Sequence, residues 1–380
     1  MHAVVLLAVF RLMLRLELGP EYDSNANRAE VVAGAATQSD VPTGSPLIRT
    51  TAKLSLAWRR GASLLRVQAG LGAKLFFNPA VVDQSVVVVQ AGLDERLRLG
   101  RWGELALIGD YYDAFQNLAI AACDPECLRR RDFRTGTASA RLTLLDGPGA
   151  FWLGGGFRGF QFKPDDYFSF LAPTGELGAS VTHRLGRSDD PHELTLAATY
   201  RFDDRFYQGL AQARATLPLC SPELPLSDGC LSTQTYYRAD WFHEAGLELS
   251  YVGTLLASVG YAAQINLSNS FGQSLLRHIV TLRISYRLPW QIYATCKLQL
   301  MVSKYLDPVL LDQRVSSQTF ITIEDENRNA VILDLERPVQ KLGLSVNARY
   351  SFFTNELGSP PNSFRRHVGY VGLTYHFTSR

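Results

Sequence analysis

The sequence predicts an all-β fold, a single closed antiparallel transmembrane β-barrel of about sixteen strands with short periplasmic turns and long extracellular loops. Three observations predict it. Apolar residues recur at every second position, many of the alternating segments run for 10–13 residues, and short connections alternate with long ones. Strands of water-soluble proteins are usually about 5–6 residues long, whereas a tilted strand needs about 9–11 to cross a bilayer.

The first strand begins near Leu12. Its leucines stand at positions 12, 14, 16 and 18 and alternate with Met13, Arg15, Glu17 and Gly19, before the polar stretch "YDSNANR" begins at Tyr22. A period of two places alternate side chains on opposite faces of a strand. The leucine face therefore suits lipid and the charged face suits water.

Fifteen further segments repeat this pattern. The alternation is least regular in the fifth, eighth and fourteenth, so the number of strands could range from fourteen to eighteen. In order, the expected strands cover residues 12–22, 48–58, 64–77, 86–99, 104–113, 133–145, 150–162, 174–185, 192–202, 236–251, 255–268, 277–288, 291–303, 330–337, 341–353 and 365–377.

The connections between these segments alternate in length. Short ones such as "RRG", "GRWG", "DGPG" and "PW" separate long ones, which include residues 114–132, 203–235 and 305–329. Outer-membrane barrels have short periplasmic turns and longer extracellular loops. An even strand number would place both chain ends on the periplasmic side.

Aromatic residues gather near both ends of the expected strands, as in the two aromatic girdles of a membrane barrel. Near the long loops are Tyr22, Phe77, Phe115, Phe202 and Phe352; near the short turns are Trp58, Trp102, Phe151, Tyr251, Tyr286, Trp290 and Phe377. A soluble propeller or sandwich is the alternative all-β fold. It would not explain strand length, loop asymmetry and girdles together.

Length and composition exclude several classes. The chain has 380 residues and a net charge of +2, with no long basic run, so nucleic acid is not an expected partner. No run of 18 apolar residues is present, which excludes a transmembrane helix. "AVVLLAVF" (Ala3–Phe10) could be the core of a secretory signal. We expect residues 1–11 to be a signal-peptide remnant and residues 12–380 to form the barrel.

Four of the five cysteines form two local pairs, Cys123 with Cys127 and Cys220 with Cys230, each within a long loop. A metal site would favour Cys-x2-Cys spacing or nearby histidines, and neither is present. We therefore expect two disulfides formed in an oxidising compartment, and no metal. Cys296 remains, on an apolar stripe.

No catalytic grouping is apparent, so we do not expect an enzyme or a cofactor. The seven histidines are scattered. His243 lies on an apolar stripe and is interpreted as a membrane-interface residue, and its neighbour Glu244 points to the opposite face. "GGG" (Gly154–Gly156) precedes no helix, which favours close packing or curvature in the barrel wall over a phosphate loop.

The polar face of the strands is the informative set, because Arg or Lys facing lipid at mid-bilayer costs about 2–4 kcal/mol. Its charged members should line the lumen. We expect this of Arg15, Glu17, Lys53, Arg66, Lys74, Asp94, Arg96, Arg98, Arg141, Arg158, Arg201, Arg238, Asp240, Glu244, Glu248, Arg283, Arg287, Lys297 and Arg349.

Basic residues are in excess on this face. With Arg184, Asp110, Glu176, Asp334 and Glu336 included, the polar stripes carry fifteen basic and nine acidic residues. Cross-strand pairing would neutralise many of them. The remaining positive charge would favour anions in a wet lumen, and sixteen strands are enough for an aqueous channel unless loops plug it.

Three stretches resemble a broad group of proteobacterial outer-membrane barrels, the β-barrel porins that often accompany surface-polysaccharide export loci. They are "LELGPEYDSNANR" at the start, "ILDLERPVQKLGLSVNARYSFFTN" before the end and "FRRHVGYVGLTYHF" at the close. The closing segment, with Phe377 three residues from the end, is also similar to the final strand of Gram-negative outer-membrane proteins, which the assembly machinery recognises. The resemblance implies a Gram-negative outer membrane and adds no catalytic residues.

Two functional hypotheses follow. The first is a channel or export conduit for anionic solutes or surface polysaccharide, with an open lumen. The second is a structural barrel with a plugged lumen, part of a multiprotein envelope machine for polysaccharide export or surface motility. The expected partners are outer-membrane lipid and lipopolysaccharide, the barrel-assembly machinery during insertion, and periplasmic export or motility proteins.

Overall fold

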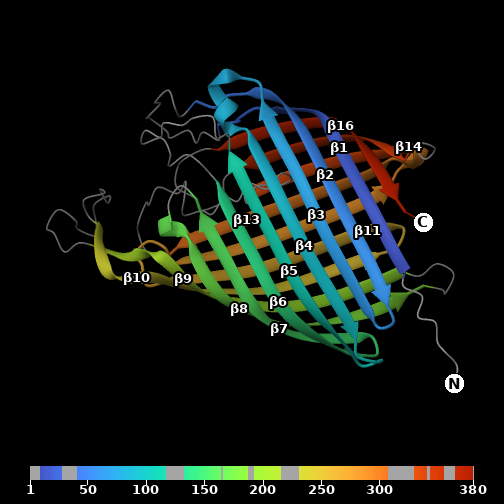
Figure 1. The fold of residues 1–380 in the computed structure, drawn as a ribbon, viewed down its shortest axis with the longest axis horizontal. Helices are drawn as coiled ribbons and strands as arrows, with labels where there is room; N and C mark the ends of the chain where they lie inside the picture. Colours follow the sequence, from blue (N-terminus) through green and yellow to red (C-terminus); the bar gives the residue numbers. More distant parts are fainter. Residues whose placement is uncertain are drawn as a thin grey trace.

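The structure is a computed structural model, and it describes residues 9–27, 41–116, 132–163, 166–186, 192–214, 231–306, 329–339, 343–354 and 364–379. These residues form a closed antiparallel barrel in which each strand pairs with its neighbours in sequence and β1 pairs with β16 (Figure 1). The predicted fold class is confirmed. No described helix is long and apolar enough to cross a membrane.

All sixteen predicted strands are present, most with ends within three residues of those predicted. They are β1 (Val9–Asp23), β2 (Ser45–Arg60), β3 (Ser63–Phe76), β4 (Val86–Arg98), β5 (Gly103–Gln116), β6 (Phe133–Asp146), β7 (Gly149–Phe162), β8 (Phe170–Leu185), β9 (His192–Arg214), β10 (Leu231–Val252), β11 (Leu255–Ser268), β12 (Leu275–Arg287), β13 (Tyr293–Tyr305), β14 (Asn329–Val339), β15 (Leu344–Thr354) and β16 (Arg365–Thr378). β1 begins inside the segment assigned to a signal remnant, whose boundary stays a prediction.

The largest departure from the expected strands is at β9 and β10. We expected residues 203–235 to be a loop, but β9 continues to Arg214 and β10 begins at Leu231, so the two strands extend beyond the others as a hairpin (Figure 1). The regular apolar stripe read from the sequence ends at Phe202, whereas backbone pairing with β10 continues to Arg214. The lipid-facing pattern therefore predicts only the membrane part of a strand.

Short 3-10 helices occupy some of the connections: η2 (Pro79–Gln84), η4 (Asp166–Phe168) and η7 (Pro289–Gln291). In η7 both Trp290 and Gln291 have φ of 59°, a backbone conformation that residues other than glycine rarely adopt. This turn joins β12 to β13, and two consecutive residues with positive φ are the geometry of a type I′ hairpin turn.

The outer face of the barrel is apolar. Leu18, Leu153, Leu247 and Val371 are each more than half exposed although they lie within strands. Their neighbours in sequence point the other way, since period two alternates the faces. A closed barrel with such an outer surface is built for contact with lipid, because every strand edge is paired.

The girdle residues also lie on this outer face. Tyr22, Phe77 and Phe202 at the long-loop end, and Trp102, Phe151 and Trp290 at the short-turn end, are exposed. Histidines take part as well. His243, interpreted from the sequence as an interface residue, has its Nδ1 atom 2.7 Å from the Tyr200 hydroxyl on the neighbouring strand. Tyr261 with His278 repeats this hydrogen bond on β11 and β12.

Candidate functional site

The inner face of the barrel is the candidate site. The nineteen residues expected to line the lumen all lie on strands, at positions that alternate with the exposed apolar residues, as an inner face requires. That they line a lumen stays a prediction. Twelve of them take part in ion pairs with described residues: Arg15, Glu17, Lys74, Asp94, Arg96, Arg141, Arg158, Arg201, Arg238, Asp240, Glu244 and Arg349.

One cluster lies at the seam where β1 meets β16 and β2. Lys74 Nζ lies 2.7 Å from Glu21 Oε1, and Arg49 is within 3.6 Å of carboxylate oxygens of both Glu17 and Glu21. Arg49 also lies over the Tyr370 ring, at 5.2 Å from its centre. These charges are buried, which requires the mutual pairing that they show.

A second pair closes the same seam. The Arg366 guanidinium on β16 donates from Nε and Nη2 to both carboxylate oxygens of Asp23 on β1, at 2.5–2.9 Å. Arg366 has 3% of its side chain exposed and Asp23 none. The first and last strands are thus joined by a buried two-pronged ion pair as well as by backbone hydrogen bonds.

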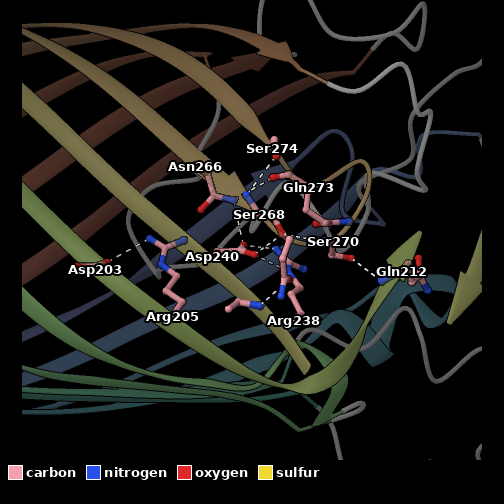
Figure 2. A network of polar contacts seen from close by, with 12 residues as sticks. Asp203, Arg205, Gln212, Arg238, Asp240, Asn266, Ser268, Ser270, Gln273 and Ser274 are labelled. Carbon is pink, nitrogen blue, oxygen red and sulfur yellow. Dashed lines mark hydrogen bonds and ion pairs between the residues drawn. The ribbon is translucent and has the colours of Figure 1, made fainter. Parts of the chain in front are cut away.

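A third network occupies the inner face of β9, β10 and β11 (Figure 2). Arg238 donates from Nε and Nη2 to Asp240, which also accepts hydrogen bonds from Asn266 Nδ2 at 3.0 Å and Ser268 Oγ at 2.5 Å. The Asp203 carboxylate forms ion pairs with two arginines, with Arg205 at 3.2 Å and with Arg158 at 3.6 Å.

Aromatic rings form an arc inside the barrel beside this network. Five rings from neighbouring strands, β5 to β9, follow one another along the wall, with successive ring centres 5.1–5.7 Å apart: Tyr112, Phe133, Phe160, Phe170 and Tyr207. Arginine side chains cover parts of the arc. Arg205 lies 5.4 Å from the Phe170 ring centre and Arg238 lies 4.0 Å from that of Tyr207. Such contacts add cation–π attraction to the burial of the rings.

The inner face differs between its two halves. In the long-loop half, charged side chains such as Glu21, Arg49 and Arg238 are at most 6% exposed. In the short-turn half, the Arg184 side chain is 83% exposed and that of Arg15 45%. Water therefore reaches the charged wall at the short-turn end, while the opposite end is packed.

A basic patch lies in the wetter half, on β12 and β13. Arg283 and Lys297 are direct cross-strand partners and both belong to the inner face. Arg287 follows four residues further along β12, on the same face. Among the described residues, no carboxylate forms an ion pair with any of these three side chains. Like charges placed opposite one another destabilise a sheet, so a wet surrounding or a bound anion must offset the repulsion.

Of the two interpretations of the "GGG" stretch, Gly154 favours close wall packing over curvature. Arg141 on β6 and Glu176 on β8 form an ion pair across the intervening strand, and Gly154 is the register partner of both. A Cβ atom at Gly154 would lie 2.8 Å from Glu176 Oε1. The missing side chain is what allows the two charges to meet.

Several inner-face residues escaped prediction from the sequence, among them Glu21, Asp23, Arg49, Asp203, Arg205, Arg277 and Arg366. Each continues the period-two count of its strand at or beyond the end of the apolar stripe. Counting inward positions past the last apolar residue would have found them.

The remaining expectations concern cysteines and metals. Cys123, Cys127, Cys220 and Cys230 lie outside the described residues, so their pairing stays a prediction. Cys296 is a free thiol on β13, on the outer face. Within the described ranges, no group of three His, Cys, Asp or Glu side chains is placed to hold a metal ion.

No family model and no curated protein matches the chain. Among solved structures, it is similar to an outer-membrane expressed OmpT of Vibrio cholerae, with a TM-score of 0.45 and 11% identity over 99% of each chain. It is similar to Salmonella typhi OmpF in a complex with daunomycin, with a TM-score of 0.47 and 10% identity over 96% of this chain and 97% of that one. A mutant of the Rh. blastica porin gives a TM-score of 0.37 and 9% identity over 98% and 100%.

Proposed function

We propose that this barrel is a channel through the outer membrane of a Gram-negative bacterium, with a preference for anions. The apolar outer face and the absence of an unpaired strand edge among the described strands support a membrane-spanning barrel. Lipid and lipopolysaccharide would contact this face, and the barrel-assembly machinery would insert it. Surface polysaccharide bearing acidic groups is one cargo of suitable charge.

The observation that carries the anion preference is the basic patch. Arg283 and Lys297 face each other across β12 and β13 without a described carboxylate partner, and Arg287 adds a third charge on the same face. Rings or patches of Arg and Lys in a water-filled pore favour anions. Ion pairs neutralise much of the remaining inner face, so this patch contributes disproportionately to the field in the lumen.

Conductance across a planar bilayer tests the proposal. In a gradient of potassium chloride, the reversal potential should show a preference for chloride. The double variant Arg283→Glu, Lys297→Glu should lower the anion-to-cation permeability ratio by about fivefold or more, the factor that corresponds to the ~1 kcal/mol of a unit charge at contact in water.

A charge reversal on the outer face of the barrel provides the matched control. Arg134 lies on β6 outside the inner face, where its Nε donates to Gln161 at 2.5 Å, so Arg134→Glu should leave the permeability ratio unchanged. Absence of any conductance from the folded protein would reject the channel. An ohmic channel without ion preference would reject the role of the basic patch.

A second candidate function rests on the packed half of the barrel. Buried aromatic rings and buried charges in the long-loop half favour a structural barrel with a closed lumen, serving as a component of an envelope machine together with periplasmic export or motility proteins. Such a barrel would conduct no ions and would co-purify with those partners.

A further inference from the structure

Three residues on the outer face of β11, β12 and β13 form a cluster at the long-loop end, which we call the Lys304 triad. The Tyr261 hydroxyl lies 2.7 Å from His278 Nδ1. Lys304 pairs in register with Leu276, two residues from His278 on the same face, so Lys304 and His278 are diagonal neighbours. Diagonal neighbours on one face of an antiparallel pair are about 7–8 Å apart, within reach of long side chains. One ligand group can therefore contact both.

The same arrangement recurs on β15 and β16, as the Arg365 triad. The Tyr350 hydroxyl lies 2.7 Å from His367 Nδ1, and the Phe352 ring centre lies 4.8 Å from that of the imidazole. Arg365 stands two residues before His367 on the same strand, and therefore on the same face and nearer the long loop. In both triads a basic side chain lies beside an imidazole that a tyrosine holds in place.

Both triads present groups that bind anions. Because Nδ1 is engaged by the tyrosine, Nε2 is the imidazole nitrogen that can contact a group outside the wall. Lys304 and Arg365 are exposed, and no described carboxylate forms an ion pair with either. The described carboxylates of β10 to β16 all occupy the alternate, inner positions: Asp240, Glu244, Glu248, Asp334 and Glu336. The charge that complements this part of the outer face is therefore negative.

A third pair of this kind lacks the basic residue. The Tyr200 hydroxyl on β9 lies 2.7 Å from His243 Nδ1 on β10. The next outward residue towards the long-loop end of β10 is Trp241, and its register partner is Asp204. Tyrosine–histidine pairing thus occurs without a cation, and the added cation is what distinguishes the two triads. An anion should be attracted to the triads and not to this pair.

The donors of the triads suit a phosphate group on a lipid. Phosphate offers several acceptor oxygens, so one can pair with the ammonium or guanidinium group while another accepts from imidazole Nε2. Tyr261 and Tyr350 are exposed on the outer face, on the mid-barrel side of the histidines. A lipid can therefore lay its apolar part along the tyrosines and its phosphate at the triad, which a free phosphate ion cannot do.

We propose that the two triads bind phosphate groups of lipopolysaccharide in the outer leaflet. The inference deepens the proposed function, because it rests on the placement of the long-loop end at the outer surface of an outer membrane. The lipid anchor of lipopolysaccharide, lipid A, carries phosphates on its disaccharide. β13 and β16 are three strand spacings apart, roughly 14 Å, so each triad is a separate phosphate site.

Lipid binding to the purified, delipidated full chain tests the proposal, with native mass spectrometry in detergent counting the bound lipids. The probes are lipid A with both phosphates, the same lipid after removal of both, and phosphatidylglycerol. Phosphorylated lipid A should bind about tenfold more tightly than the dephosphorylated form, and more tightly than phosphatidylglycerol.

Charge substitutions place the binding at the triads. Lys304→Gln and Arg365→Gln should each weaken one lipid A binding step by about fivefold, the factor that corresponds to ~1 kcal/mol for one Lys or Arg near an anionic lipid surface. The double variant should weaken both steps. Arg337→Gln is the matched control, since it removes an exposed, outward arginine near the short-turn end of β14, and it should leave binding unchanged.

Histidine substitutions test the donor role of Nε2. His278→Phe and His367→Phe keep a ring beside the tyrosine but remove the nitrogen, and each should weaken one binding step by about fivefold, as for one hydrogen bond with a net value of ~1 kcal/mol. His243→Phe removes the same group from the pair without a cation and should have no effect.

Equal binding of dephosphorylated lipid A would overturn the proposal, and so would an equal loss in Arg337→Gln. Phosphatidylglycerol bound as tightly as lipid A would reject lipopolysaccharide as the occupant. The comparison of lipids needs no variant, so it survives a variant that fails to fold. A protein that binds lipid A without conducting would keep the triads and reject the channel, whereas an anion-selective channel indifferent to the phosphates would keep the channel and reject the triads.

Discussion

Gly154 leaves the space in which two charged side chains of β6 and β8, Arg141 and Glu176, form an ion pair. Arg141 and Glu176 lie two strands apart, and they reach each other only over a position without a side chain. The period-two pattern predicted that Arg141 lies on the polar face of its strand, and its ion pair with Glu176 is consistent with that position. Its partner could not be predicted, because strand register in a barrel depends on the stagger between strands, which one strand's sequence does not contain.

Replacing Gly154 by alanine should destabilise the protein by about 1–3 kcal/mol, as expected when an extra methyl group is forced into a packed site. The added Cβ would lie 2.8 Å from Glu176 Oε1 and 2.9 Å from its Cγ. Urea unfolding in detergent measures the change.

Gly155→Ala is the matched control in the same triplet. Its nearest contact would be the Thr174 carbonyl at 3.6 Å, an ordinary packing distance. This variant should remain within about 0.5 kcal/mol of wild type. Equal destabilisation by both substitutions would mean that glycine at these positions serves backbone flexibility rather than the ion pair.

At the scale of single elements, the sequence located every strand but not every strand end. The lipid-facing stripe marks the membrane part of β9, from Leu194 to Phe202, and the strand continues through Asp203 and Asp204 to Arg214. Charged residues at that point resemble a loop in sequence. In the structure Asp203 and Asp204 continue the strand and pair with Phe242 and Trp241 of β10.

The turn between β12 and β13 offers a stabilising change. Gln291 has φ of 59°, a conformation that costs a residue with a side chain about 1–2 kcal/mol relative to the right-handed one. Gln291→Gly should therefore stabilise the barrel by about 1 kcal/mol, measured as a higher urea midpoint. Gln291→Ala keeps the Cβ atom and should give no gain. If both variants gain stability, relief of backbone strain is not the cause.

The seam between β1 and β16 is the element contact that closes the barrel. Asp23→Ala would leave the Arg366 guanidinium buried without its carboxylate, and breaking a buried pair in this way costs about 3–5 kcal/mol. Heat-modifiable migration on gels and urea unfolding would report the loss. Asp23→Ala with Arg366→Met should recover most of it, and a double variant as unstable as the single one would contradict the uncompensated charge as the cause.

For the whole molecule, the sequence predicted an apolar outer face and a charged inner face of the barrel wall. It did not predict that the long-loop half is packed while the short-turn half is more exposed to water. Outward leucines and inward charges follow from the alternation alone. The packing of Phe160, Phe170 and Tyr207 with Arg205 and Arg238 in the long-loop half depends on residues from separate strands. Only the closed barrel brings them together, and it leaves the basic patch in the wetter half.

This placement predicts that the proposed anion preference depends on the salt concentration. The Arg283 side chain is exposed, so mobile ions in the lumen should screen its charge and that of Lys297 beside it. The screening length is about 10 Å at 0.1 M salt and about 3 Å at 1 M. The permeability ratio, taken from reversal potentials under a constant tenfold gradient, should fall towards one as the mean concentration rises from 0.1 M to 1 M. The Arg283→Glu, Lys297→Glu variant should start from the opposite preference and converge on the same value. A preference unchanged by salt would instead assign selectivity to the buried arginines of the long-loop half, where the packed wall excludes the screening ions.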